Sequence, residues 1–158
     1  MKTFNSYAAL RDCAGQEIAV TDWLTITQPQ IQLFADATGD QQWIHTDPQR
    51  AAQGPFGAPI AHGFLSLSLL PMFFEQAVQI QGAVMGVNYG LNKVRFPAPV
   101  PVGSRVRGRV SVQGVEPVAP DGVQITWLVT VEREGSDKPV CVAESLTRSY
   151  GAPMGHWD

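Results

Sequence analysis

The spacing of apolar side chains indicates a strand followed by a helix near the N-terminus. Residues 17–27 alternate between polar and apolar side chains, which predicts a half-buried strand. Thr27 is then suited to cap the N-terminus of a helix, and Gly39 is suited to end it. The apolar side of the strand consists of Ile18, Val20, Leu24 and Ile26.

A second, longer helix is predicted further along the chain. Residues 40–57 are rich in turn-forming residues, with one short turn at Asp47-Pro48, where Asp can cap and Pro can take the first position. An almost wholly apolar helix is then predicted over Gly63–Gln79. Because a helix that is apolar on all sides must be buried, this one belongs at the centre of the fold.

Only strand patterns follow this helix. In the first of them the apolar phase shifts after Leu91 to Val94 and Phe96, which predicts a β-bulge near Gly90. The order of elements predicts an α+β fold with one antiparallel sheet and a helix lying across it. The alternating segments are 83–91, 105–115, 123–131 and 140–148, and turns are predicted at Pro120–Gly122 and Glu134–Asp137.

Composition indicates how many domains to expect and what kind of surroundings suit the protein. The 158 residues fit one domain, 1–158, with a short C-terminal tail at about 151–158. Only 16% of residues are charged, below the value of about 25% typical of soluble domains, so we expect apolar surface to meet another subunit or an apolar ligand. Cys13 and Cys141 lie far apart and predict reduced thiols in a cytoplasmic protein. The most apolar stretch, Ile60–Phe74, is too short and too interrupted to cross a membrane.

Charge is unevenly distributed along the chain. Residues 76–115 contain no acid, whereas their basic residues are Lys93, Arg95, Arg105, Arg107 and Arg109. Two interpretations remain open: alternate strand residues that face solvent, or a positive surface for an anionic ligand such as the phosphates of a nucleotide carrier. The sequence pI of about 5.5 and the lack of a basic tail or binding motif argue against nucleic acid.

The segment Phe34–Gly63 contains the residues suited to chemistry. Asp40 and His45 follow the predicted helix end, and a carboxylate and an imidazole around one water can perform general acid–base catalysis. His62-Gly63 begins the long helix, where unpaired N–H groups can polarise an acyl oxygen. Spacing alone also allows purely structural roles for both pairs. His156, in the tail, is expected to be an ordinary surface residue.

These residues resemble the hydratase signature of the MaoC-like, (R)-specific enoyl-CoA hydratase family, in its nodulation-protein-N-like branch. The resemblance implies a hot-dog fold, in which an antiparallel sheet wraps around a long central helix. It also implies a homodimer whose sheets join edge to edge, with an acyl tunnel near the interface. The matching segments, in the family's order, are Thr38–Pro48 (TGDQQWIHTDP), Ala51-Ala52 and Pro59–Gly63 (PIAHG).

The resemblance assigns roles by position. Asp40 and His45 match the catalytic dyad, and Gly63 matches the glycine whose backbone N–H binds the thioester oxygen. Tyr89–Phe96 also resembles the family, although a solvent-exposed strand end is an equally simple interpretation of that segment. The residues expected to contact the substrate are His62, Asn92, Lys93 and Arg95.

The sequence departs from the family pattern at two places. Gln42-Trp43 stand where Asn-Pro is usual, and Pro71 stands where a serine often supports the catalytic Asp. Both departures leave the dyad in place, and they bear on the range of substrates.

The activity implied by the resemblance is the reversible syn hydration of a trans-2-enoyl-CoA to a (3R)-3-hydroxyacyl-CoA, a lyase reaction of fatty acid metabolism. Asp40 and His45 would hold the water, one removing its proton and the other delivering a proton to C2. No metal or separate cofactor is expected, since the sequence has no ligand cluster or nucleotide fingerprint, and CoA is part of the substrate. Two alternatives stay open: an acyl-CoA thioesterase on the same fold, and a non-catalytic protein that binds acyl-CoA or lipid.

Overall fold

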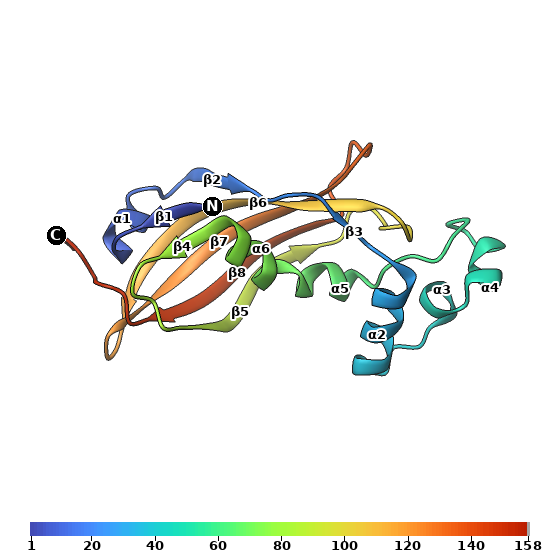
Figure 1. The fold of residues 1–158 in the computed structure, drawn as a ribbon, viewed down its shortest axis with the longest axis horizontal. Helices are drawn as coiled ribbons and strands as arrows, with labels where there is room; N and C mark the ends of the chain where they lie inside the picture. Colours follow the sequence, from blue (N-terminus) through green and yellow to red (C-terminus); the bar gives the residue numbers. More distant parts are fainter. Residues whose placement is uncertain (158) are drawn as a thin grey trace.

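The structure is a computed structural model that describes residues 1–157, so Asp158, the last residue of the predicted tail, lies outside it. An antiparallel sheet with strand order β2-β6-β7-β8-β5 carries the central helical segment on one face (Figure 1). The short β3 also pairs with β6. The strand bounds are β2 Gln16–Val20, β3 Leu24–Thr25, β5 Met85–Arg95, β6 Arg105–Val118, β7 Gly122–Arg133 and β8 Cys141–Tyr150. The predicted turns and the alternation of β6 and β7 are confirmed. The predicted phase of residues 140–148 is wrong, because Cys141, Ala143 and Ser145 are buried in β8, whereas Val142 and Leu146, the residues that the pattern places inside, are only half-buried.

The central helical segment lies across the sheet, as predicted, but it is not one continuous helix. It consists of α5 (Gly63–Ser68) and α6 (Leu70–Ala77), which meet at Leu69. Pro71 near the start of α6 has no N–H to donate to the preceding turn, which accounts for the interruption.

The expected end of this helix at Gln79 is wrong. Beyond Ala77 the chain becomes extended as β4 (Val78–Ile80), which pairs in parallel with β1 (Lys2–Phe4). Neither short strand was predicted, nor was α1 (Tyr7–Arg11), because their stability comes from pairing and packing between distant parts of the chain.

The core lies between α6 and the sheet. Phe73 of α6 is fully buried, and its ring contacts β6 at Gly108, where an added Cβ would lie only 2.9 Å from the ring. Glycine at this position therefore allows the helix to approach the sheet closely. The inward side chains of β6 and β7, including Val106, Val110, Val112, Val123, Ile125, Val129 and Val131, complete the core.

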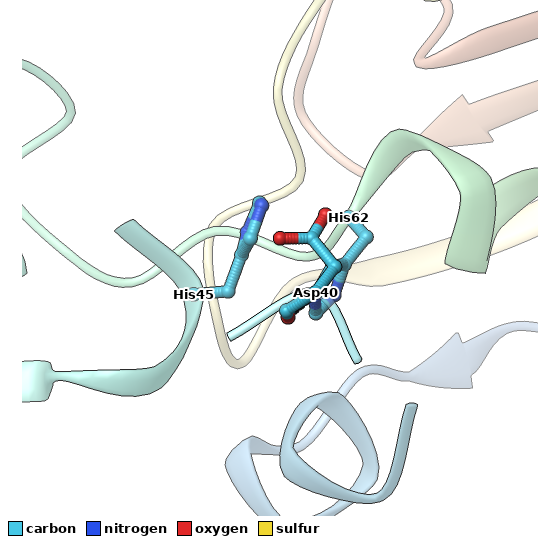
Figure 2. A group of neighbouring side chains, drawn as sticks. All are labelled: Asp40, His45 and His62. Atoms are coloured by element: carbon cyan, nitrogen blue, oxygen red, sulfur yellow. Dashed lines mark hydrogen bonds between the residues drawn. The ribbon is translucent and has the colours of Figure 1, made fainter. Parts of the chain in front are cut away.

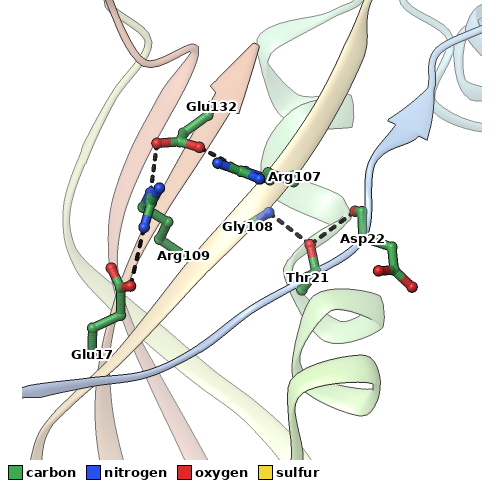
Figure 3. Close-up of polar contacts among 7 residues, drawn as sticks. All are labelled: Glu17, Thr21, Asp22, Arg107, Gly108, Arg109 and Glu132. Carbon is green, nitrogen blue, oxygen red and sulfur yellow. Dashed lines mark hydrogen bonds and ion pairs between the residues drawn. The ribbon is translucent and has the colours of Figure 1, made fainter. Parts of the chain in front are cut away.

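The predicted strand over 17–27 is divided in the structure. Thr21 interrupts it: its hydroxyl accepts a hydrogen bond from the N–H of Gly108 (2.9 Å) and donates one to the carbonyl of Asp22 (3.2 Å; Figure 3). The pairing register of β2 with β6 also shifts between Glu17 and Ala19. This shift leaves Val20 exposed, contrary to the sequence pattern.

β5 is the edge strand at the other end of the sheet. The predicted bulge is confirmed, since the pairing with β8 shifts between Asn88 and Gly90 and again between Leu91 and Lys93. Within the described residues β5 pairs with β8 alone. The apolar side chains expected to be buried are consequently exposed in the single chain: Met85, Val87, Tyr89 and Leu91.

Ion pairs occupy the sheet face opposite the central helix. Glu132 binds both Arg107 and Arg109, and Arg109 also reaches Glu17 (Figure 3). Arg105 pairs with Glu134 at 3.1 Å. Glutamates from outside residues 76–115 thus pair with three of the five basic residues in that segment. This pairing favours the interpretation that these arginines are solvent-facing strand residues.

Three short helices project beyond one end of the sheet (Figure 1): α2 (Gln28–Thr38), α3 (Trp43–Thr46) and α4 (Pro48–Ala52). The predicted ends of α2 are confirmed, since Thr27 accepts from the N–H of Gln30 and Gly39 adopts a φ of 82°. The predicted cap of α4 is also confirmed, with Asp47 accepting from the N–H of Arg50 at 3.1 Å. α3 itself was not predicted.

The described part of the tail packs against α1, at the end of the molecule opposite α2–α4 (Figure 1). The side chain of Arg11 donates to the carbonyl of His156 at 2.9 Å and lies over the ring of Trp157. The His156 side chain is exposed, as predicted. Both cysteines are free thiols. Within residues 1–157, every helix is too short or too polar to cross a bilayer.

Candidate active site

Three predicted residues come together where α2–α4 meet the start of the central helix (Figure 2). Asp40 lies in the loop after α2, His45 lies in α3, and His62 precedes α5. One polar side-chain atom from each lies within 4.8 Å of the others. Asp40 is exposed, whereas His45 and His62 are only 6% and 2% exposed. The cluster therefore has one solvent-facing carboxylate and two buried imidazoles.

Hydrogen bonding fixes the tautomer of His45. Its Nδ1 lies 2.6 Å from the carbonyl oxygen of Ile60, which can only accept, so Nδ1 carries the hydrogen. The neutral ring then has a free lone pair on Nε2. The side-chain amide of Gln28 donates to the backbone carbonyl of His45 at 2.8 Å and holds this part of α3 in place.

The surroundings of His45 favour the neutral ring. Burial lowers the pKa of His45 below its ordinary value of 6.5, and the neighbouring His62 lowers it further. The hydrogen bond to Ile60 and the charge of Asp40 act in the opposite direction, but the net shift is downward. A neutral imidazole with its Nε2 lone pair free is suited to accept a proton.

His62 lies between two rings. It stacks on His45 with ring centroids 3.8 Å apart and an interplanar angle of 24°, and it contacts Phe34 at 4.9 Å. Its Nε2 donates to the backbone carbonyl of Asp40 at 2.9 Å. Among residues 1–157, its buried Nδ1 has no hydrogen-bond partner. Leaving a buried acceptor unpaired costs about 1–3 kcal/mol.

The three side chains are also of types that bind transition metals. Their geometry is poorly suited to this, because the planes of His45 and His62 differ by only 24°. The lone pairs of an imidazole lie in the ring plane, so those of two stacked rings run side by side and do not converge on one ion. Binding a metal through both rings would require one of them to rotate.

Gly63 begins α5 directly after His62, next to the cluster. An added Cβ would lie 3.1 Å from the ring of Phe96. A pocket of about 260 Å³ adjoins this residue, and its lining includes Phe56, Ile60, Gly63, Ser66 and Phe96. The missing side chain lets the Phe96 ring approach Gly63 closely, and the adjoining pocket gives a small polar group such as a thioester access to the helix start.

Two further cavities lie between the central helix and β5. One, of about 370 Å³, is lined by side chains that include Leu67, Leu70, Tyr89 and Leu91. The other, of about 400 Å³, has a lining that includes Phe74, Met85, Val87, Ile125 and Trp127. Their largely apolar walls are suited to a hydrocarbon chain.

The remaining predicted site residues lie on β5, outside the Asp40–His45–His62 cluster. The amide of Asn92 donates to Glu144 on the neighbouring strand at 3.0 Å. Lys93 and Arg95 are exposed, and the guanidinium of Arg95 donates to the carbonyl of Val94. The structure thus brings together Asp40, His45, His62 and Gly63, and leaves the three β5 residues separate from them.

Three groups that hold the cluster were not predicted from the sequence: Gln28, Phe34 and the carbonyl of Ile60. A backbone carbonyl has no signature in the sequence, because every residue has one. A phenylalanine within a helix indicates packing and nothing more specific, and a helical glutamine carries no distinctive signal.

Comparisons with known proteins support a common ancestry over most of the chain. The protein-family model described as "MaoC like domain" matches residues 11–133. The chain is 59% identical over 148 residues to 3-hydroxyacyl-thioester dehydratase Z of Mycobacterium tuberculosis, covering 94% of this chain and 98% of the relative. It is 47% identical over 135 residues to nodulation protein N of Rhizobium leguminosarum bv. viciae, covering 84% of each. The unliganded R-hydratase PhaJ1 from Pseudomonas aeruginosa superposes with a TM-score of 0.68 at 28% identity, covering 94% of this chain and 86% of PhaJ1.

Proposed function

The chain belongs to the MaoC-like dehydratase family and has its hot-dog fold, and we propose that it adds water to 2-enoyl thioesters and removes it from 3-hydroxyacyl thioesters. This makes it a 3-hydroxyacyl-thioester dehydratase, a hydro-lyase. The observation that carries the proposal is the meeting of the Asp40 carboxylate with a neutral, correctly oriented His45 beside Gly63.

In the hydration direction, we propose that the thioester oxygen accepts a hydrogen bond from the N–H of Gly63, which draws electrons away from C3. Nε2 of His45 removes a proton from water as the water oxygen attacks C3, giving an enolate at the thioester. The proton passes from His45 to the Asp40 carboxylate, and Asp40 delivers it to C2. One water is consumed and the dyad returns to its starting state.

The hydrogen bonds support this assignment of base and acid, which the sequence leaves open. His45 can accept a proton on Nε2, because its Nδ1 hydrogen is held by Ile60. Asp40 is exposed and its side-chain oxygen lies close to the rings, so it can receive the proton and reach the same face of the substrate. Addition of H and OH from one face gives syn hydration, with the (3R) product expected of the family.

The experiment that tests the proposal follows the enoyl-thioester absorbance when the protein meets crotonyl-CoA and longer trans-2-enoyl-CoAs. We expect loss of absorbance with the wild type, and a loss of turnover of about 10²–10⁴-fold in Asp40→Asn. Asp137→Asn, the same change in an exposed turn between β7 and β8, is the matched control and should keep full activity.

The same assay separates the alternatives. Release of free thiol without loss of the enoyl absorbance would indicate a thioesterase. Binding of acyl-CoA without any reaction would indicate a carrier. Either result would contradict the proposed hydro-lyase activity.

We further propose that the natural substrate is a CoA thioester and that the protein is a cytoplasmic homodimer. The exposed apolar side chains of β5 and its free edge support the dimer, because a second β5 can pair there and cover them. The two free thiols support the location. Comparing a CoA thioester with the same acyl group on an acyl-carrier protein tests the substrate.

A further inference from the structure

His62 contacts both members of the proposed dyad while being almost completely buried. Its N–H holds the backbone carbonyl of Asp40 at 2.9 Å, and its ring face covers His45 at 3.8 Å. The residue that follows it is Gly63, the proposed binding group for the thioester oxygen. One side chain therefore connects the acid, the base and the start of the central helix (Figure 2).

Packing alone does not account for a histidine here. A phenyl ring would fill nearly the same space between Phe34 and His45, and it would leave no polar atom unpaired. The histidine instead buries Nδ1 without a partner among residues 1–157, which is unfavourable for folding. The imidazole differs from a phenyl ring in its Nε2–H, which donates the hydrogen bond to the Asp40 carbonyl.

The neighbouring Gln41 is held by Asp36 and Thr46, at 2.8 and 3.0 Å, but the other hydrogen bonds of Asp40 itself are local. The N–H of Asp40 is 3.4 Å from the hydroxyl of Thr38, and its carboxylate accepts from the N–H of Gln42 at 3.3 Å. Both contacts are long and lie within the same exposed segment. Within residues 1–157, the bond to His62 is the hydrogen bond that ties Asp40 to the start of the central helix.

We infer that His62 is a positioning residue of the dehydratase site: it holds Asp40 and His45 at the spacing at which both act on one water, without contacting the substrate. This inference rests on the proposed function. Misplacing a reacting group by about 1 Å can lower a rate by about 10²-fold, so a lost anchor at Asp40 should be visible in turnover.

His62 also lowers the pKa of His45. The titratable groups that face His45 are Asp40 and His62, and their effects on the pKa of His45 are opposite, with His62 lowering it. A neutral phenyl ring at position 62 removes the repulsion between two stacked imidazoles. The pKa of His45 should therefore rise when His62 is replaced by Phe.

The test is His62→Phe, which keeps the ring and removes the hydrogen bond. We expect kcat for crotonyl-CoA hydration to fall about 10–100-fold with KM changed by less than about twofold. We also expect NMR titration of the His45 ring to move to higher pH. A residue that only fills space would change neither quantity, so wild-type kcat or an unchanged His45 titration would overturn the inference.

Two additions keep the test decisive. If His62→Phe does not fold, His62→Leu takes its place, since it fills apolar space and likewise has no N–H donor for the Asp40 carbonyl; kcat within about twofold of wild type would then overturn the inference. If the wild type itself does not hydrate enoyl thioesters, the proposed function fails. The NMR titration, which needs no substrate, still shows whether His62 controls His45.

Discussion

The pH dependence of hydration tests the role of His45 most directly. The proposed mechanism needs this ring neutral, and burial lowers its pKa from the ordinary value of 6.5. Even with an unshifted pKa of 6.5, about 90% of the ring would be neutral at pH 7.5, and the downward shift increases this fraction. We therefore expect kcat/KM to be flat from about pH 7 to 8 and to fall about tenfold per unit well below the pKa of His45.

Replacing His45 by Gln removes the proton acceptor and keeps an amide that can still donate to Ile60. We expect kcat to fall by about 10²–10⁴-fold, which corresponds to about 2.7–5.4 kcal/mol of lost transition-state stabilisation. The inflection below pH 6.5 should disappear in this variant. His156→Gln, the same change at an exposed position of the tail, is the control and should match the wild type.

Stopped-flow or steady-state absorbance of crotonyl-CoA between about pH 5 and 9 provides the data, with circular dichroism to check folding. An inflection above pH 6.5 would refute the argument that burial and His62 keep this ring neutral. Turnover in His45→Gln close to that of the wild type would refute the assignment of His45 as the base.

Three other perturbations test the fold and the assembly. Gly108→Val places a branched side chain where a Cβ already lies 2.9 Å from the Phe73 ring, so chemical denaturation should show a loss of about 1–3 kcal/mol. Glu132→Gln should lower stability by at most about 1 kcal/mol at pH 7. The hydrogen bond from Arg109 lowers the pKa of Glu132 below its ordinary value of 4.5. The stabilisation from this carboxylate is therefore present above pH 4.5 and is lost as the pH falls through the lowered pKa. A difference in stability between Glu132→Gln and the wild type that is as large at acid pH as at pH 7 would contradict this. Leu91→Asp should convert the proposed dimer to monomer in sedimentation, and a monomeric wild type would rule out the β5 interface.

Local sequence determined the elements that depend on near neighbours. Thr27 and Gly39 set the ends of α2, because a cap and a residue with positive φ act within one turn of the helix. The alternation in β6 and β7 determined their inward faces, because side chains of a strand alternate whatever it pairs with. In β8 the larger apolar side chains do not mark the inward face, since Cys141 and Ala143 are buried and Val142 is only half-buried. Asp40, His45 and Gly63 could be predicted together, because all three belong to one continuous motif of the chain.

The tertiary structure decided what depends on distant partners. The exposure of β5 follows from its position at the sheet edge, and the switch from helix to β4 follows from pairing with β1. Within the site, the tautomer of His45 depends on the carbonyl of Ile60, and the His45 ring lies against that of His62, 17 positions along the chain, only because the fold brings them together. Backbone carbonyls and ring stacking act through space between residues that are not neighbours in the chain, and for that reason no local pattern of residues could reveal them.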